Sequence, residues 1–231
     1  MDTTPLRPAE HAESQIIAAI LDGIYPIDSN LPAERELATQ LGVTRPTLRE
    51  ALQRLARDGW LEIRQGKPTR VCNYWQEGNL AVLAAVAAHQ SHLPADFVPN
   101  LLQVRTLLAP TYTRLAVERA GETLAVFMTP LADLLDESAA FSVADWELHH
   151  QLTILSGNPV FTLIFNGFQN LYLDMSLHYF ADPAARAHSR AFYTSLAACA
   201  LAGEADTAEA LCRWVMQESA ERAVRGVVSR D

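Results

Sequence analysis

Three long polar side chains recur at every fourth position of the segment 45–58, namely Arg45, Arg49 and Gln53. If this segment is helical, they lie together on one face, because residues four apart are neighbours on a helix surface. The planar fork of an arginine matches the two acceptors that guanine presents in the major groove of DNA. The spacing therefore predicts a helix face that reads base edges.

A second group of reactive side chains lies in the segment 142–156. Asp145 and His149 would share a helix face, as metal ligands often do, but two ligands make an incomplete site, and we expect His149 and His150 to be structural. Glu147 and His149 could act as acid and base, yet there is no nucleophile motif, no glycine-rich phosphate loop and no complete set of metal ligands. We therefore predict no catalytic residues, no cofactor, no metal and no enzymatic activity.

The base-reading face needs a helix that is anchored on its other side. An apolar stripe at helical spacing supplies the anchor: Leu48, Ala51, Leu52 and Leu55. Thr44 is the predicted N-cap, Pro46 is tolerated in the first turn, and Gly59 ends the helix near Asp58.

The flanking segments complete a winged helix-turn-helix. Their patterns predict helices at 9–23 and 33–40 and short strands at 60–64 and 69–73. Gly66 is expected at positive φ in the turn between the strands, so that Lys67 projects toward phosphate or the minor groove. We assign residues 1–74 to this DNA-binding domain, with the hairpin as its wing.

Charge is distributed unevenly along the chain. The net charge is −9, but residues 43–70 carry seven basic and three acidic side chains, and residues 75–231 carry nine and seventeen. A basic patch on an acidic protein is typical of a DNA-binding protein, because the patch is attracted to the phosphates of DNA while the rest of the protein is repelled by them.

From residue 75 onward no strand pattern appears, so we predict a mainly α protein whose second domain, 75–231, is an all-α antiparallel bundle. Breaks at glycine and proline divide it into helices at 77–90, 95–118, 122–138, 142–156, 160–180, 184–202 and 204–228. The 95–118 segment contains Pro99 and Pro110 and is expected to bend.

Composition excludes several classes of protein. The longest apolar run, 80–88, is too short for a membrane span of about 20 residues. The N-terminus lacks a secretory signal, and the three cysteines (Cys72, Cys199 and Cys212) include no close pair. We expect a cytoplasmic protein with reduced cysteines and no membrane partner.

The segment 160–180 is dense in aromatic and apolar residues, a pattern that is usually core. Polar residues interrupt it: Asn166, Asn170, Tyr172 and Tyr179. Buried polar atoms need partners, and a ligand can supply them. The segment is therefore a candidate wall of a ligand site.

The N-terminal residues resemble the GntR family of bacterial transcription regulators. The resemblance rests on four stretches: Leu31–Ala38, Gly42–Arg45, Leu48–Leu52 and Asp58–Gly59. Stretches at 52–61, 66–69, 100–102, 104–106, 156–159, 171–172, 178–181 and 192–193 are similar to the FadR subfamily, so the resemblance covers nearly the whole chain.

The resemblance implies which residues touch DNA. The candidate contacts are Glu34, Arg35, Thr44, Arg45, Pro46, Thr47, Arg49, Gln53, Gln65, Gly66 and Lys67. Pro46 stands where a threonine is usual and Gln65 where a histidine is usual, so each is expected to remove or change one contact.

The resemblance also implies a ligand, a long-chain fatty acyl-CoA enclosed by the helical domain. The residues it assigns to the site are Arg105, Tyr172, Tyr179, Tyr193, Arg213 and Ser219. Met216 replaces a glycine of the subfamily and Ala223 a tryptophan. Related effector domains bind a metal through an Asp-x3-His pair and two further histidines, whose places Tyr193 and Val215 take here.

We therefore predict a homodimeric regulator of fatty acid metabolism that binds a pseudo-palindromic operator in double-stranded DNA. The resemblance implies repression of fatty acid degradation genes, activation of unsaturated fatty acid synthesis genes, and release from DNA by long-chain acyl-CoA. One alternative is a GntR repressor that senses a small carboxylate, with or without a metal. The other is a helical enzyme with a DNA-binding appendage.

Overall fold

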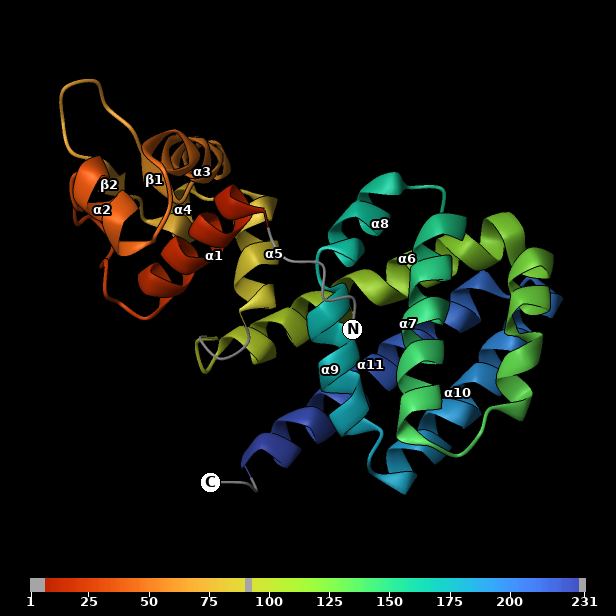
Figure 1. The fold of residues 1–231 in the computed structure, drawn as a ribbon. Helices are drawn as coiled ribbons and strands as arrows, with labels where there is room; N and C mark the ends of the chain where they lie inside the picture. Colours follow the sequence, from red (N-terminus) through yellow and green to blue (C-terminus); the bar gives the residue numbers. More distant parts are fainter. Residues whose placement is uncertain (1–6, 90–92, 229–231) are drawn as a thin grey trace. The chain divides into compact units, whose positions relative to one another are not determined.

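A computed structural model describes residues 7–89 and 93–228 of the chain. It divides into two compact units, residues 1–93 and 94–231 (Figure 1). The described residues are mainly helical, with a single two-stranded sheet. The predicted fold class, a winged helix-turn-helix followed by a helical domain, is confirmed.

The N-terminal unit contains the predicted motif in the predicted order. Its helices are α1 (Pro8–Leu21), α2 (Glu34–Gln40), α3 (Arg45–Asp58), α4 (Tyr74–Glu77) and α5 (Leu80–Ala88), and its strands are β1 (Leu61–Glu62) and β2 (Arg70–Val71). Helix α3 packs on α1 and α2. Its stripe is fully buried, with Leu48, Ala51 and Leu55 at 0% exposure, so α3 is held by its apolar side.

Both ends of α3 lie where the sequence places them. Thr44 caps the helix, and its side-chain oxygen accepts a hydrogen bond from the Thr47 amide at 3.3 Å. Gly59 ends the helix in the left-handed region with φ 97°. A Cβ atom on Gly59 would lie 2.8 Å from Gly78 Cα, so a larger residue would be strained in both backbone and packing.

The wing is shorter than predicted. Antiparallel pairing covers only Leu61 with Val71 and Glu62 with Arg70, not the full segments 60–64 and 69–73. Beyond these pairs the chain turns at residues 65 and 66, where Lys67 N donates to Arg64 O, and Pro68 after the turn has no amide to donate. The connector before α2 adds pairing that was not predicted, because Val71 N donates to Ser29 O and Leu31 N donates to Thr69 O.

The N-terminal unit extends beyond the predicted domain boundary at residues 74 and 75. Helix α5 begins at an N-cap, Asn79, whose side chain accepts from Ala81 N and whose amide donates to Asp58 O. The bond from Asn79 N to Asp58 O attaches the start of α5 to the end of α3. The predicted helix 77–90 is therefore wrong at its start, since it is divided at Asn79, and its last residue lies outside the described residues.

The C-terminal unit is built around α6 (Phe97–Met128), which packs against α7 (Ser138–Leu155), α10 (Pro183–Ala202) and α11 (Ala205–Val228). Helices α8 (Pro159–Asn166) and α9 (Gln169–Tyr179) pack on α7, and a 3-10 turn, η2 (Thr129–Asp133), follows α6. Leucines with no exposed surface fill the centre of the core: Leu124, Leu148, Leu152 and Leu196. No helix in the described ranges is long and apolar enough to cross a membrane.

Two predicted boundaries in this unit are wrong for identifiable reasons. Helix α6 continues from the predicted segment 95–118 into the first part of the segment 122–138, because the chain bends at Ala120 (φ −151°, ψ 40°) instead of ending there. The rest of the segment 122–138 is not one helix, since η2 covers 129–133 and α7 begins at Ser138. A Cβ atom on Gly121 would collide with the backbone oxygen of Ala200, so this glycine serves close packing. The segment 160–180 is two helices, because the chain breaks at Gly167 between α8 and α9.

Candidate DNA-binding face and buried cavity

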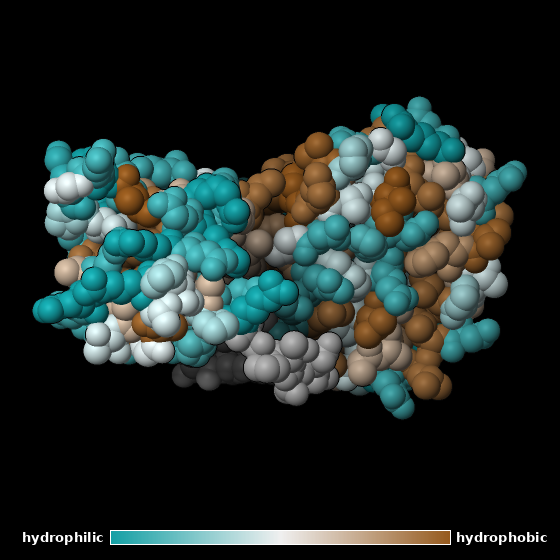
Figure 2. All heavy atoms as spheres, turned by 45° about the horizontal axis from the view of Figure 1, so that its top comes forward, coloured by the Kyte–Doolittle hydropathy of each residue, from teal (hydrophilic) through white to brown (hydrophobic). Residues whose placement is uncertain are grey.

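The predicted contact side chains lie on the surface of the N-terminal unit. Arg45, Arg49 and Gln53 are all exposed on α3, and Arg35 is exposed on α2. Gln65, Gly66 and Lys67 are exposed in the wing loop, and Gly66 has the predicted positive φ of 72°. In Figure 2 the N-terminal unit, on the left of the view, shows a mostly hydrophilic surface. Thr44 and Pro46 are also exposed, whereas Glu34 and Thr47 are half-buried. The predicted set thus lies at the surface of α2, of the N-terminal part of α3 and of the wing.

Ion pairs engage much of the basic patch. Arg49 Nε lies 2.8 Å from Glu34 Oε2, and Arg64 and Arg70 both bond to Glu62. The Arg49 pair is exposed, so it stabilises by at most about 1 kcal/mol and can open for DNA. Two basic residues of the segment 43–70 have no ion pair among the described residues: Arg45 and Lys67. These two present the least compensated charge to DNA.

We expect Arg45→Ala to weaken operator binding by about 1–3 kcal/mol and to relax specificity at one base pair. Lys67→Ala should weaken binding to all sequences evenly and reduce the salt slope by about one, because its expected partner is phosphate. Fluorescence anisotropy with operator and scrambled DNA at several salt concentrations measures both. Arg57→Ala is the matched control, since Arg57 is exposed on the same helix and paired with Asp58. Equal loss of specificity in all three variants would contradict this division.

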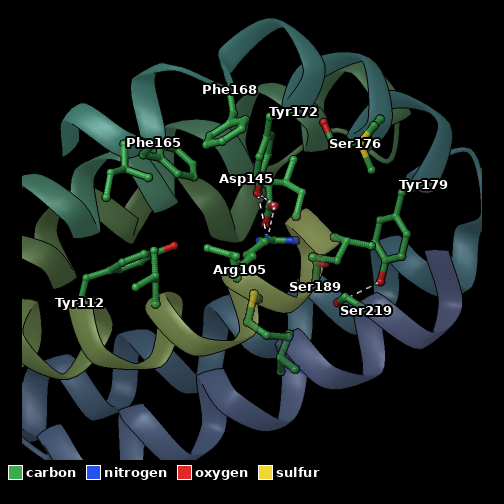
Figure 3. Close-up of a pocket in the computed structure, with 18 of the residues that line it drawn as sticks. Arg105, Tyr112, Asp145, Phe165, Phe168, Tyr172, Ser176, Tyr179, Ser189 and Ser219 are labelled. Atoms are coloured by element: carbon green, nitrogen blue, oxygen red, sulfur yellow. Dashed lines mark hydrogen bonds and ion pairs between the residues drawn. The ribbon is translucent and has the colours of Figure 1, made fainter. Parts of the chain in front are cut away.

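The C-terminal unit encloses a cavity with mostly apolar walls (Figure 3). The walls come from α6 to α11, and aromatic and aliphatic side chains dominate them: Leu101, Leu108, Phe161, Ile164, Phe165, Phe168, Met175, Phe192 and Met216. Helices α8 and α9 supply the aromatic wall that the sequence predicted. Asn166 and Asn170 are exposed, so the prediction that they are buried polar groups is wrong.

One cluster of polar side chains interrupts the apolar wall. Arg105 Nη2 lies 2.9 Å from the Tyr172 hydroxyl, 3.1 Å from His149 Nε2 and 3.5 Å from Asp145 Oδ2. The Tyr172 hydroxyl donates to Asp145 Oδ2 at 2.5 Å, and the Tyr193 hydroxyl donates to Asp145 Oδ1 at 2.8 Å. Both oxygens of the buried Asp145 carboxylate are therefore satisfied.

This cluster bears on the metal and enzyme hypotheses. Asp145 and His149 do share a face of α7, but the guanidinium of Arg105 lies between them and already supplies a cation. Burial, with a contribution from Arg105, lowers the pKa of His149 to about 4. Glu147 is exposed whereas His149 is fully buried, so these two cannot form the acid and base pair considered above.

The structure brings four of the six predicted ligand residues to the cavity: Arg105, Tyr172, Tyr179 and Ser219. Tyr193 lies behind it, bonded to Asp145, and Arg213 forms an ion pair with Glu209 on α11. Met216 is buried in the cavity wall. Sequence reasoning missed Tyr112, which has no local pattern that distinguishes it from a core aromatic.

A winged helix-turn-helix with an exposed basic face, joined to a helical unit with a buried cavity, defines the class of DNA-binding regulatory proteins. Residues 8–71 match the gntR family of bacterial regulatory proteins, and residues 72–225 match the FadR C-terminal domain. The chain therefore belongs to the GntR family, with a C-terminal domain of the FadR type.

Relatives with this organisation are similar along most of the chain. A fatty acid metabolism regulator protein of Cronobacter sakazakii is 42% identical over 219 residues, which cover 93% of this chain and 90% of the relative. One from Escherichia coli O1:K1 is 39% identical over 214 residues, with the same coverage. The solved structure of Lar from Listeria monocytogenes is 15% identical with a TM-score of 0.52, covers 96% of this chain and 99% of its own, and shows the fold alone.

Proposed function

We propose that this chain is a transcription regulator of fatty acid metabolism whose affinity for its operator is lowered by long-chain fatty acyl-CoA. The observation that carries the proposal is the cavity in the FadR-type domain, whose walls are apolar and aromatic enough to take an acyl chain. The relatives named as fatty acid metabolism regulators support the same assignment.

The DNA-binding half acts as a homodimer in this proposal. One recognition helix with its wing reads too few base pairs for a selective operator, so a two-fold assembly on a pseudo-palindromic site doubles the readout. Repression of fatty acid degradation genes and activation of unsaturated fatty acid synthesis genes belong to the same proposal and follow from the subfamily resemblance.

Helix α11 offers a route for the two ends of the ligand. Arg213, Met216 and Ser219 are spaced by three, so they follow one another along one side of the helix. Met216 and Ser219 line the cavity, while the side chain of Arg213 is 48% exposed. The apolar chain would lie in the cavity, and Arg213 would meet the CoA phosphates at the surface, exchanging Glu209 for a phosphate oxygen.

Met216 sets the strength of this interaction. Its side chain is 3% exposed and lines the cavity, so it narrows the space next to Ser219. We expect Met216→Gly to bind hexadecanoyl-CoA more tightly than the wild type in titration calorimetry of the full chain. Met216→Ala is the matched control, because it removes most of the side chain without the helix cost of about 1 kcal/mol for glycine.

Two results would decide against the proposal. If the wild type and both Met216 variants fail to bind acyl-CoA, the ligand is not an acyl-CoA. The second result would be a metal with a small carboxylate, in place of acyl-CoA, in mass spectrometry of the natively purified protein; it would support the alternative regulator that senses a small carboxylate. The guanidinium of Arg105 between Asp145 and His149 argues against that alternative.

A further inference from the structure

Arg105 presents hydrogen-bond donors to the cavity for which the described residues supply no acceptor. All three of its polar contacts, with Asp145, His149 and Tyr172, use the same nitrogen, Nη2. The Nε atom is buried and has no hydrogen-bond partner among the described residues. In Figure 3 one guanidinium nitrogen points away from Asp145, toward the middle of the cavity.

The Tyr112 hydroxyl is a second such donor, which follows from the ring nitrogen of His149 that carries the proton. Arginine can only donate hydrogen bonds, so His149 Nε2 must accept from Arg105 at 3.1 Å. A ring with Nε2 as acceptor is neutral and carries its proton on Nδ1. That Nδ1–H donates to the Tyr112 oxygen at 2.9 Å, so the hydroxyl proton of Tyr112 remains available.

The surroundings offer no acceptor for these donors within the described residues. Asp145 already accepts from Tyr172 and Tyr193, and the ring next to Tyr112 in the wall is Phe161, at 5.9 Å between centroids. Figure 3 shows the Tyr112 hydroxyl pointing toward Arg105. Donors buried without acceptors cost free energy, and a hydrocarbon chain cannot accept a hydrogen bond.

We propose that the cavity recognises a neutral oxygen acceptor of the acyl ligand, held jointly by the guanidinium of Arg105 and the hydroxyl of Tyr112. The acceptor is neutral because the charge of Arg105 is already balanced by Asp145, so a second carboxylate would be uncompensated among apolar walls. This proposal rests on the proposed function and makes Tyr112 a residue that determines ligand specificity.

Within the acyl portion of the ligand, two kinds of neutral oxygen are candidates, and ligand analogues distinguish them. The first is the thioester carbonyl, which S-hexadecyl-CoA lacks. The second is a hydroxyl on the chain, supplied by hydroxyhexadecanoyl-CoA isomers with the hydroxyl at different carbons. Calorimetry of the full chain should show that one of these oxygens tightens Kd about tenfold, the worth of one net hydrogen bond. Either hexadecanoyl-CoA binds more tightly than S-hexadecyl-CoA, or one hydroxy isomer binds more tightly than hexadecanoyl-CoA.

Tyr112→Phe should reduce that tenfold ratio severalfold, because it removes one of the two donors, the hydroxyl, and keeps the ring. Thr113→Val is the matched control, since Thr113 is the buried neighbour of Tyr112 on α6, does not line the cavity and already donates its hydroxyl proton to Cys212 Sγ at 3.4 Å, and we expect it to keep the ratio. The ratio of two Kd values for one variant cancels any general loss of binding, and circular dichroism confirms that each variant is folded.

The outcomes separate this proposal from the proposed function. If hexadecanoyl-CoA, its thioether and every hydroxy isomer bind the wild type equally, the oxygen is not recognised and the proposal is wrong, while the proposed function stands. A ratio that Tyr112→Phe leaves unchanged also overturns it. If none of these ligands binds, both fail. The wild-type series alone decides the matter if Tyr112→Phe does not fold.

Discussion

Replacing Arg105 by methionine is expected to destabilise the C-terminal unit by about 3 kcal/mol, the low end for breaking a buried ion pair. The substitution keeps the volume but leaves the Asp145 carboxylate, 6% exposed, without its cation. We take the low end because Asp145 keeps hydrogen bonds from Tyr172 and Tyr193. Urea unfolding followed by circular dichroism measures the change.

A double-mutant cycle assigns the loss to the pair. Asp145→Asn combined with Arg105→Met should recover part of the stability, because no buried charge remains uncompensated. If the two substitutions are simply additive, Arg105 stabilises the unit through packing alone, and our description of the cluster is wrong.

The second large effect is a loss of stability in acid through His149. Burial places the pKa of His149 at about 4, below the ordinary value of about 6.5. Between these values the unfolded chain binds a proton that the folded chain does not, so the free energy of unfolding decreases as the pH falls. Above pH 6.5 neutral His149 contributes its full share to the free energy of unfolding. Once the pH falls below 4, this share is lost, which lowers the free energy of unfolding by about 3 kcal/mol.

Carboxylates titrate in the same range, so the comparison must be with a matched variant. His149→Gln keeps an acceptor for Arg105 but does not titrate. The free energy of unfolding of this variant should therefore fall less steeply than that of the wild type between pH 6.5 and 4. The difference between the two decreases should reach up to about 3 kcal/mol. Parallel curves would show that His149 is protonated at the same pH in the folded and unfolded states.

The sequence predicts the DNA-binding unit in detail because its signals are local. Thr44 and Gly59 fix the two ends of α3 through a cap and a left-handed residue, and Gly66 fixes the turn of the wing. These features depend on neighbours a few residues away, which a pattern can show. The shortened strands differ from prediction because the β1–β2 pairing ends well before the wing turn, and Pro68 has no amide to donate on the β2 side.

The cavity is less predictable because its members meet through tertiary packing. Arg105 is 40 residues from Asp145 and 67 from Tyr172 in the chain, so no spacing rule joins them. The spacing of Asp145 and His149 indicates a possible ligand pair, but only the fold shows that the guanidinium of Arg105 contacts both side chains. Gly167, by contrast, is a local signal for the break between α8 and α9. The aromatic periodicity of the segment 160–180 favours one continuous helix and hides this signal.

One measurement tests the central claim most directly: the affinity of the full chain for operator DNA with and without long-chain acyl-CoA. A ligand lowers operator affinity only if it binds more tightly to the form that fits DNA poorly. We expect saturating hexadecanoyl-CoA to weaken operator binding in an anisotropy titration, whereas acetyl-CoA, which lacks the chain, should not. Unchanged operator affinity at concentrations where calorimetry shows the cavity filled would contradict the account.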